Sequence, residues 1–163
     1  IYIIRDPREV LVSYASHYNM SIDELLDEFV SNNILFKIKT ETIINWRLHY
    51  RSWKSFKSVP SLFLKYEDLI QQPKNNFEKL IIFLSKYLNI QVDKKNIEKT
   101  IEIIRFDKLK KLETKSGFHE APKNTIFFRS GKIDSWKEIL SKSQIKKVED
   151  AFYTDMQELG YIK

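Results

Sequence analysis

An arginine and a serine early in the chain have the side chains needed to bind an anionic group. Arg5 follows the apolar run at 1–4, and Ser13 lies about two turns into a predicted helix that begins at Pro7. A guanidinium offers charge and paired donors to a phosphate, and a hydroxyl adds a further hydrogen bond. In the structural alternative, Arg5 pairs with a nearby carboxylate and Ser13 is an ordinary helix residue.

Three further candidates for ligand binding are spread over later segments. Gly131 lies in a basic turn at 129–132, where a glycine lets the backbone approach an anion closely. Phe106 precedes a lysine-rich segment and offers a ring that can stack on a base. Tyr66 follows a predicted strand end. The structural alternatives are a core phenylalanine beside a solvated lysine face and a tyrosine packed at the sheet edge.

The other reactive side chains form no recognisable catalytic pattern. His17, His49 and His119 are scattered, and no carboxylate pair or Ser–His–Asp order indicates a catalytic centre. We therefore identify no catalytic residue and expect no metal site. The chain has no cysteine, which excludes disulfides, thiol catalysis and thiolate metal ligands.

The composition is that of a basic chain with enough apolar residues for a core. Its 163 residues fit one domain, 42% are hydrophobic, and the formal net charge is +6. This charge indicates either a lysine-rich solvated surface or an anionic partner, but no RNA-binding signature, basic zipper or zinc-finger spacing is present. No apolar run reaches transmembrane length and no signal peptide is visible. Together with the absent cysteines, this predicts a cytoplasmic protein.

Apolar spacing and turn signals predict an α/β fold with a parallel sheet. The run at 1–4 predicts a strand buried on both faces. Two such strands need neighbours, so we expect the chain to be the C-terminal part of a larger fold. The predicted elements are a strand at 1–4, helices at 7–18, after Ser21 and at 40–56, a strand at 61–66, a helix turning Phe77, Leu80, Ile81, Leu84 and Leu88 inward, helices at 94–103 and 106–112, a polar loop at 113–125, and a last helix from Ser141 to Gly160.

In their order and spacing these segments resemble the cytosolic-type sulfotransferases, which use 3′-phosphoadenosine 5′-phosphosulfate (PAPS). The resemblance rests on RDPREVLVS at 5–13, YED at 66–68, RFDKLKKLE at 105–113 and RSGKIDSWK at 129–137. A tryptophan-histidine-tryptophan pattern like the family's occurs at Trp46, His49 and Trp53. The chain departs from the family at Arg105, where the family has serine, at Ser130, where it has lysine, and at Asp134 and Ser135, where it has glycine and aspartate.

The resemblance implies an α/β fold with a P-loop NTPase-like parallel sheet and flanking helices, of which this chain is an incomplete, helix-rich C-terminal portion. It implies a single sulfotransferase domain over 1–163, truncated at its N-terminus and without the loop that binds the phosphosulfate. It also implies PAPS as co-substrate and no metal. The implied 3′-phosphate ligands are Arg5, Ser13, Arg129 and Gly131, and the implied adenine contacts are Tyr66 and Phe106. Ser130 is counted with these cofactor-binding residues.

The implied reaction is transfer of a sulfuryl group from PAPS to a hydroxyl or amine. The acceptor would be a small molecule, a glycan or a peptide, and no nucleic acid would take part. We expect weak or absent transfer by this chain alone, because it lacks the phosphosulfate loop. Two alternatives are a non-catalytic binder of adenine nucleotides and a basic nucleic-acid-binding module, whose binding would depend steeply on salt.

Overall fold

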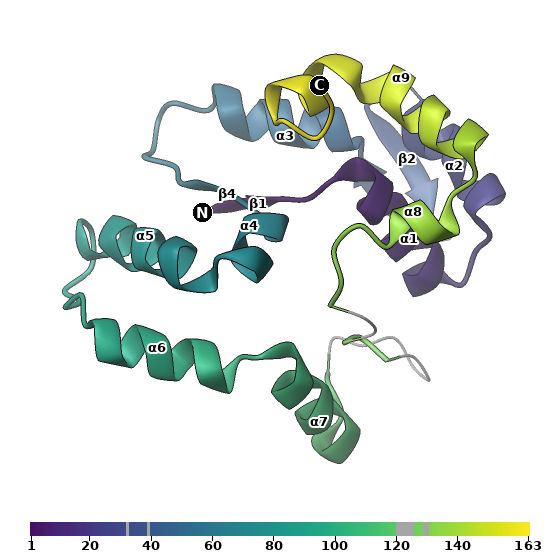
Figure 1. Cartoon of the computed structure of the whole chain (residues 1–163). Helices are drawn as coiled ribbons and strands as arrows, with labels where there is room; N and C mark the ends of the chain where they lie inside the picture. Colours follow the sequence, from purple (N-terminus) through teal and green to yellow (C-terminus); the bar gives the residue numbers. More distant parts are fainter. Residues whose placement is uncertain (32, 39, 120–125, 129–130) are drawn as a thin grey trace. The chain divides into compact units, whose positions relative to one another are not determined.

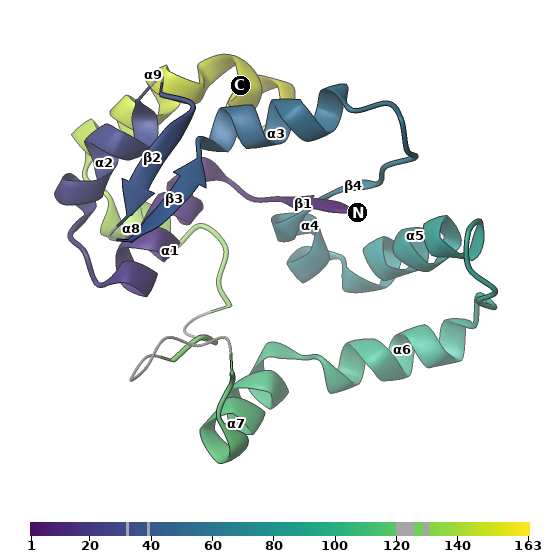
Figure 2. The ribbon, with the colours of Figure 1, turned by 180° about the vertical axis from the view of Figure 1, so that it is seen from behind.

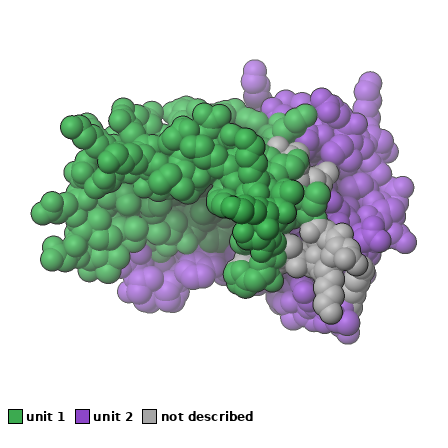
Figure 3. All heavy atoms as spheres, turned by 90° about the horizontal axis from the view of Figure 1, so that it is seen from below, with its two compact units in different colours: residues 1–3, 61–133 green, residues 4–60, 134–163 purple. Residues whose placement is uncertain are grey.

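The structure is a computed structural model, and it describes residues 1–31, 33–38, 40–119, 126–128 and 131–163 (Figure 1). The chain contains two compact units, which are coloured separately in Figure 3. Unit 1 comprises residues 1–3 and 61–133, and unit 2 comprises residues 4–60 and 134–163. The fold class is α/β as predicted, since a small parallel sheet is combined with helices.

Unit 2 consists of helices packed around one antiparallel pair of strands. The helix α2 packs against α1, α9 and β2, and α1 also packs against α8 and α9. Figure 2 shows the strand pair lying beside α2. The elements of this unit are α1 (Pro7–Tyr18), α2 (Ile22–Val30), β2 (Leu35–Ile38), β3 (Glu41–Ile44), α3 (Trp46–Ser55), α8 (Trp136–Ile139) and α9 (Lys142–Glu158).

Local capping bonds start three helices where the sequence predicts them. Asp6 Oδ1 accepts a hydrogen bond from the Arg8 backbone N–H (2.9 Å), and Pro7 occupies the first turn of α1. Such bonds satisfy N–H groups that the first helical turn leaves without partners. Complete capping boxes join Ser21 to Glu24 at α2 and Ser141 to Gln144 at α9.

The long helix predicted at 40–56 is wrong in its first third. Glu41–Ile44 form the strand β3, which pairs antiparallel with β2, and Leu35 lies opposite Ile44 in the register. The β-branched residues at 42–44 favour a strand, because their side chains lose freedom in a helix. The helix starts only after Asn45, which caps it by accepting the Arg47 backbone N–H (3.0 Å).

We expect the substitution Asn45→Ala to lower the free energy of unfolding by about 2 kcal/mol. The Asn45 side chain is buried, caps α3, and donates through Nδ2 to the Ser31 carbonyl oxygen (2.8 Å). Its removal costs about 1 kcal/mol for the cap and about the same for the carbonyl left without a donor. Urea unfolding measures the change, and Asn75→Ala, at an exposed position of the helix α5 (Pro73–Ser85), is the matched control. A loss of equal size in both variants would contradict the capping role.

The core of unit 2 joins three helices through aromatic rings. Phe29 from α2 and Phe152 from α9 are fully buried, with perpendicular rings 5.7 Å apart. Trp46 from α3 packs on Phe152 at 5.2 Å between ring centroids. The helix α9 is kinked at Phe152, whose φ of −114° is not helical. Val148, Phe152 and Met156 of α9 are all buried, so this face of the helix points into the core.

Unit 1 combines the start of β1 with four helices of the middle of the chain. The strands β1 (Tyr2–Ile4) and β4 (Phe63–Lys65) form the two-stranded parallel sheet. The Tyr2 N–H donates to the Leu62 carbonyl oxygen at 2.8 Å. The helices are α4 (Tyr66–Gln71), α5 (Pro73–Ser85), α6 (Lys94–Ile103) and α7 (Phe106–Ser116).

Several expectations for unit 1 are corrected. The first strand is not buried on both faces, because side chains alternate along it and Ile3 is 54% exposed. Leu88 was expected to face inward but lies beyond the end of α5 and is exposed. The helix α7 continues to Ser116, so the loop predicted from 113 begins only at Gly117, whose φ is +70°. The rest of that predicted loop, 120–125, lies outside the described residues.

Candidate functional site

Arg5 and Ser13 both belong to the start of unit 2. Arg5 follows the carboxyl end of β1, and its guanidinium Nη2 donates to Glu9 Oε2 at 3.0 Å. The side chain of Arg5 as a whole remains 25% exposed. Ser13 is half-buried within α1. The expected structural alternative for Arg5 is therefore present, since a carboxylate does pair with it.

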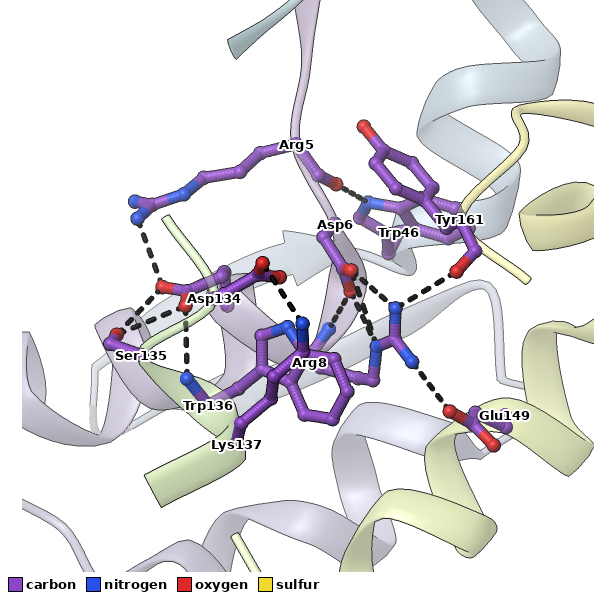
Figure 4. Close-up of polar contacts among 11 residues, drawn as sticks. Arg5, Asp6, Arg8, Trp46, Asp134, Ser135, Trp136, Lys137, Glu149 and Tyr161 are labelled. Carbon is purple, nitrogen blue, oxygen red and sulfur yellow. Dashed lines mark hydrogen bonds and ion pairs between the residues drawn. The ribbon is translucent and has the colours of Figure 1, made fainter. Parts of the chain in front are cut away.

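Glu9 is a buried carboxylate that joins two segments far apart in the sequence, and its partners Arg5, Ser135 and Trp136 are labelled in Figure 4. Its Oε1 accepts the Trp136 backbone N–H at 2.9 Å. The Ser135 hydroxyl lies 3.0 Å from both carboxylate oxygens. Glu9 thereby connects the first turn of α1 and Arg5 to the start of α8. Sequence reasoning missed this role, although the spacing of four residues between Arg5 and Glu9 across the predicted helix start was a usable signal.

Arg8 forms a second buried cluster beside Glu9, also shown in Figure 4. Its Nε and Nη2 donate to the two oxygens of Asp6 at 2.9 and 2.6 Å. Nη1 donates to Glu149 Oε1 at 2.5 Å, and Nη2 also donates to the Tyr161 carbonyl oxygen at 3.2 Å. Burial alone would lower the pKa of Arg8, but these carboxylates outweigh burial and raise it. The guanidinium therefore stays charged in the interior.

The indole ring of Trp136 packs against the Arg8 guanidinium of this cluster. The Arg8 guanidinium carbon lies 3.8 Å from the centroid of its ring, a cation–π distance. Trp136 is buried as the first residue of α8 and anchors the start of that helix. Lys137 forms an exposed ion pair with Asp134 at 2.9 Å.

The tryptophan-histidine-tryptophan pattern lies on α3. Trp46 is buried, and its Nε1 donates to the Arg5 carbonyl oxygen at 3.1 Å, which fixes the backbone where β1 meets α1. Burial lowers the pKa of His49. Trp53 is 43% exposed. The first member of the pattern therefore contacts a predicted ligand-binding residue.

Phe106 and Gly131 are brought together within unit 1. A Cβ atom built on Gly131 would lie 2.3 Å from Phe106 Cδ2, so the glycine backbone passes directly over the ring. The ring of Phe128 meets Phe106 edge-on, with centroids 6.2 Å apart. The Glu113 carboxylate at the end of α7 accepts the backbone N–H groups of Phe127 (2.6 Å) and Phe128 (2.9 Å). These contacts attach the segment before Gly131 to α7.

The remaining predicted ligands are Tyr66, Arg129 and Ser130. Tyr66 is the first residue of α4 and is half-buried. Arg129 and Ser130 lie outside the described residues. Because Arg5 and Ser13 belong to unit 2 and the other described candidates to unit 1, the complete site stays a prediction.

The described residues contain neither a candidate metal site nor a helix that could span a membrane. Among them, no group of three or more histidine or acidic side chains is arranged to hold a metal ion. None of the helices in the described ranges is both long and apolar enough to cross a membrane.

Comparison with known proteins gives one consistent family. A flavonol 3-sulfotransferase of Flaveria bidentis is 29% identical over 167 residues, which cover 91% of this chain and 52% of that protein. The cytosolic sulfotransferase 15 of Arabidopsis thaliana is 28% identical over 160 residues, covering 91% of this chain and 44% of that protein. The chain thus spans about half the length of the curated relatives it matches.

The fold is shared with a solved mouse structure. The mouse sulfotransferase SULT7A1, crystallised as a complex with PAP, superposes with a TM-score of 0.75 at 21% identity. The match covers 95% of this chain and 56% of the mouse protein. A family model described as the sulfotransferase domain matches residues 1–160. Since this match includes nearly all of the sequence, the chain belongs to the sulfotransferase domain family.

Proposed function

We propose that this chain is the nucleotide-binding part of a sulfotransferase that transfers a sulfuryl group from PAPS to a hydroxyl or amine. The observation that carries the proposal is the position of Arg5. Its partly exposed side chain follows the carboxyl end of a parallel strand, and its guanidinium pairs with a buried carboxylate. Ligands of open α/β sheets bind at the carboxyl ends of the strands.

We assign the predicted ligands to two parts of the nucleotide. The 3′-phosphate accepts hydrogen bonds from Arg5, Ser13, Arg129 and Gly131, and the adenine ring lies against Phe106 and Tyr66. Gly131 packs against the Phe106 ring without room for a side chain, so a proposed phosphate ligand and a proposed adenine contact lie together in unit 1. Ser130, between Arg129 and Gly131 in the sequence, is counted with the nucleotide-binding residues.

The transfer itself exchanges one bond to sulfur for another. The acceptor oxygen or nitrogen forms a bond to sulfur while the bond between sulfur and the bridging phosphate oxygen breaks. Adenosine 3′,5′-bisphosphate (PAP) leaves with the electron pair, and the acceptor proton passes to a general base. Cationic groups stabilise the charge that develops on the leaving phosphate. The chain's own residues contribute by binding and orienting the nucleotide, and we assign none of them as the base.

The same proposal extends to the domain, the acceptor and the location. Residues 1–163 belong to one sulfotransferase domain, and β1 and β4 are two strands of its P-loop NTPase-like parallel sheet. The acceptor is a small molecule with a hydroxyl group, as the name of the Flaveria relative indicates for that protein. A cytosolic location is supported by the name of the Arabidopsis relative.

Calorimetric titration of the purified chain with PAP and with AMP tests the proposal. We expect PAP to bind at least about tenfold more tightly, because charge-assisted hydrogen bonds to the 3′-phosphate contribute more than about 1.4 kcal/mol. In Arg5→Ala the affinity for PAP should fall about tenfold while that for AMP stays unchanged.

The control is Lys146→Ala, which removes one exposed positive charge from the same unit. This variant should retain the preference for PAP. Equal binding of PAP and AMP by the unaltered chain would overturn the proposal. Loss of PAP affinity in both variants would mean that net charge, and not a 3′-phosphate site at Arg5, determines binding.

A further inference from the structure

We propose that Glu9 is a positioning residue that holds the Arg5 guanidinium in the orientation needed for the 3′-phosphate. The inference rests on the proposed function, since it concerns the same phosphate site. Neither the sequence motif nor the family comparison assigns this carboxylate a role. The proposal is based on the contacts, the burial and the charge of Glu9.

The burial of Glu9 shows that its hydrogen bonds are required. Its side chain is only 3% exposed, and a carboxylate removed from water is costly unless it is paired and hydrogen-bonded. Oε1 faces the Trp136 backbone N–H, and Oε2 faces Arg5 Nη2. The Ser135 hydroxyl lies within hydrogen-bonding distance of both oxygens. The Glu9 carboxylate is thus held by a backbone N–H and a side-chain hydroxyl in addition to its bond with Arg5.

A carboxylate held in this way limits the motion of Arg5. A free arginine side chain has about 2 kcal/mol of rotamer entropy to lose when it binds a ligand. The bond from Nη2 to Glu9 and the bond from the Trp46 indole to the Arg5 carbonyl oxygen restrain both ends of the residue. The guanidinium is therefore ordered before the phosphate arrives, and less entropy is lost on binding.

The charge of Glu9 acts in the opposite direction. A negative group next to a phosphate site repels the anion, so charge alone predicts that neutralising Glu9 would tighten PAP binding. Positioning predicts that the same change would weaken it. The two effects have opposite signs, and one substitution can tell them apart.

Glu9→Gln is the substitution that separates the contacts of Glu9. The glutamine oxygen can still accept the Trp136 N–H, and the amide group then faces Arg5 Nη2, donor against donor. We expect the PAP affinity to fall about fivefold, the AMP affinity to stay unchanged and the preference for PAP to shrink accordingly. In the Arg5→Ala background, Glu9→Gln should have no further effect on PAP affinity, because its target is gone.

Each outcome of this comparison of single and double variants either supports or overturns the positioning role of Glu9. Tighter PAP binding by Glu9→Gln would mean that Glu9 acts through charge and would overturn it. Additive losses in the double variant, or equal losses for PAP and AMP, would show a general structural role and would also overturn it. Failure of the unaltered chain to prefer PAP over AMP would instead remove the proposed function itself.

A second variant covers the case in which Glu9→Gln does not fold. Thermal unfolding is recorded for every variant before titration. Ser135→Ala removes the hydroxyl that contacts both Glu9 oxygens and leaves Arg5 and Glu9 in place. We expect about a twofold loss in PAP affinity with AMP unchanged. Unchanged PAP affinity in this variant would contradict the positioning role.

Discussion

Replacement of Arg8 by methionine is expected to lower the free energy of unfolding by about 3–5 kcal/mol. The Arg8 and Asp6 side chains are each only 6% exposed, and hydrogen bonds from Nε and Nη2 join the guanidinium to both oxygens of the carboxylate. Methionine fills similar space but leaves Asp6 as a buried charge without its partner, and breaking a buried ion pair in this way costs about 3–5 kcal/mol.

The loss should affect the packing of unit 2 as a whole. Arg8 links α1 to Glu149 on α9 and to the Tyr161 carbonyl oxygen beyond it. It also covers the buried ring of Trp136. Urea unfolding followed by tryptophan fluorescence measures the change, because Trp46 and Trp136 both lie in the core.

Two comparisons test whether the loss of stability arises from breaking the buried Arg8–Asp6 pair. Lys146→Ala breaks an exposed pair with Asp150 and should cost no more than about 0.5 kcal/mol. The double variant Asp6→Asn, Arg8→Met should regain part of the loss, because no buried charge then remains without its partner. A loss below about 1 kcal/mol for Arg8→Met would contradict this account of the cluster.

Gly131→Ala is expected to weaken the binding of both PAP and AMP by about tenfold or more. The new Cβ would lie 2.3 Å from Cδ2 and 2.5 Å from Cγ of Phe106, so the ring must move. The φ of +58° at Gly131 adds backbone strain for any residue with a Cβ. Stacking of a base on an aromatic ring contributes about 1–3 kcal/mol, and both nucleotides carry the adenine that would lose it.

This result would differ in kind from that of Arg5→Ala, which should affect PAP alone. Gly117→Ala is the matched control, since Gly117 also has positive φ (+70°) but a Cβ there would meet nothing within 4 Å. It should leave both affinities unchanged and reduce stability only through backbone strain, by about 1 kcal/mol. Retention of AMP binding by Gly131→Ala would argue that Phe106 does not contact adenine.

The sequence by itself determined the helix starts that depend on neighbouring residues. The caps at Asp6, Ser21 and Ser141 are formed within three residues of chain, so their hydrogen bonds need no tertiary partner. The ordered motifs also identified the family that the comparison then established. Both the caps and the family motifs depend on residue types at fixed spacings along the chain, so the sequence alone is sufficient to predict them.

The long-range contacts were decided only by the tertiary structure. Glu9 meets Trp136 across a separation of 127 residues, and no local pattern indicates which backbone N–H a carboxylate will find. The strand pair that replaces the start of the predicted helix depends likewise on β2 supplying partners for β3. Helix and strand preferences there differ by about 1 kcal/mol or less per residue, so pairing and burial outweigh them. The sequence places Arg5 directly after a predicted strand, where it can bind an anion. Its pairing with the buried Glu9 carboxylate was revealed only by the tertiary structure.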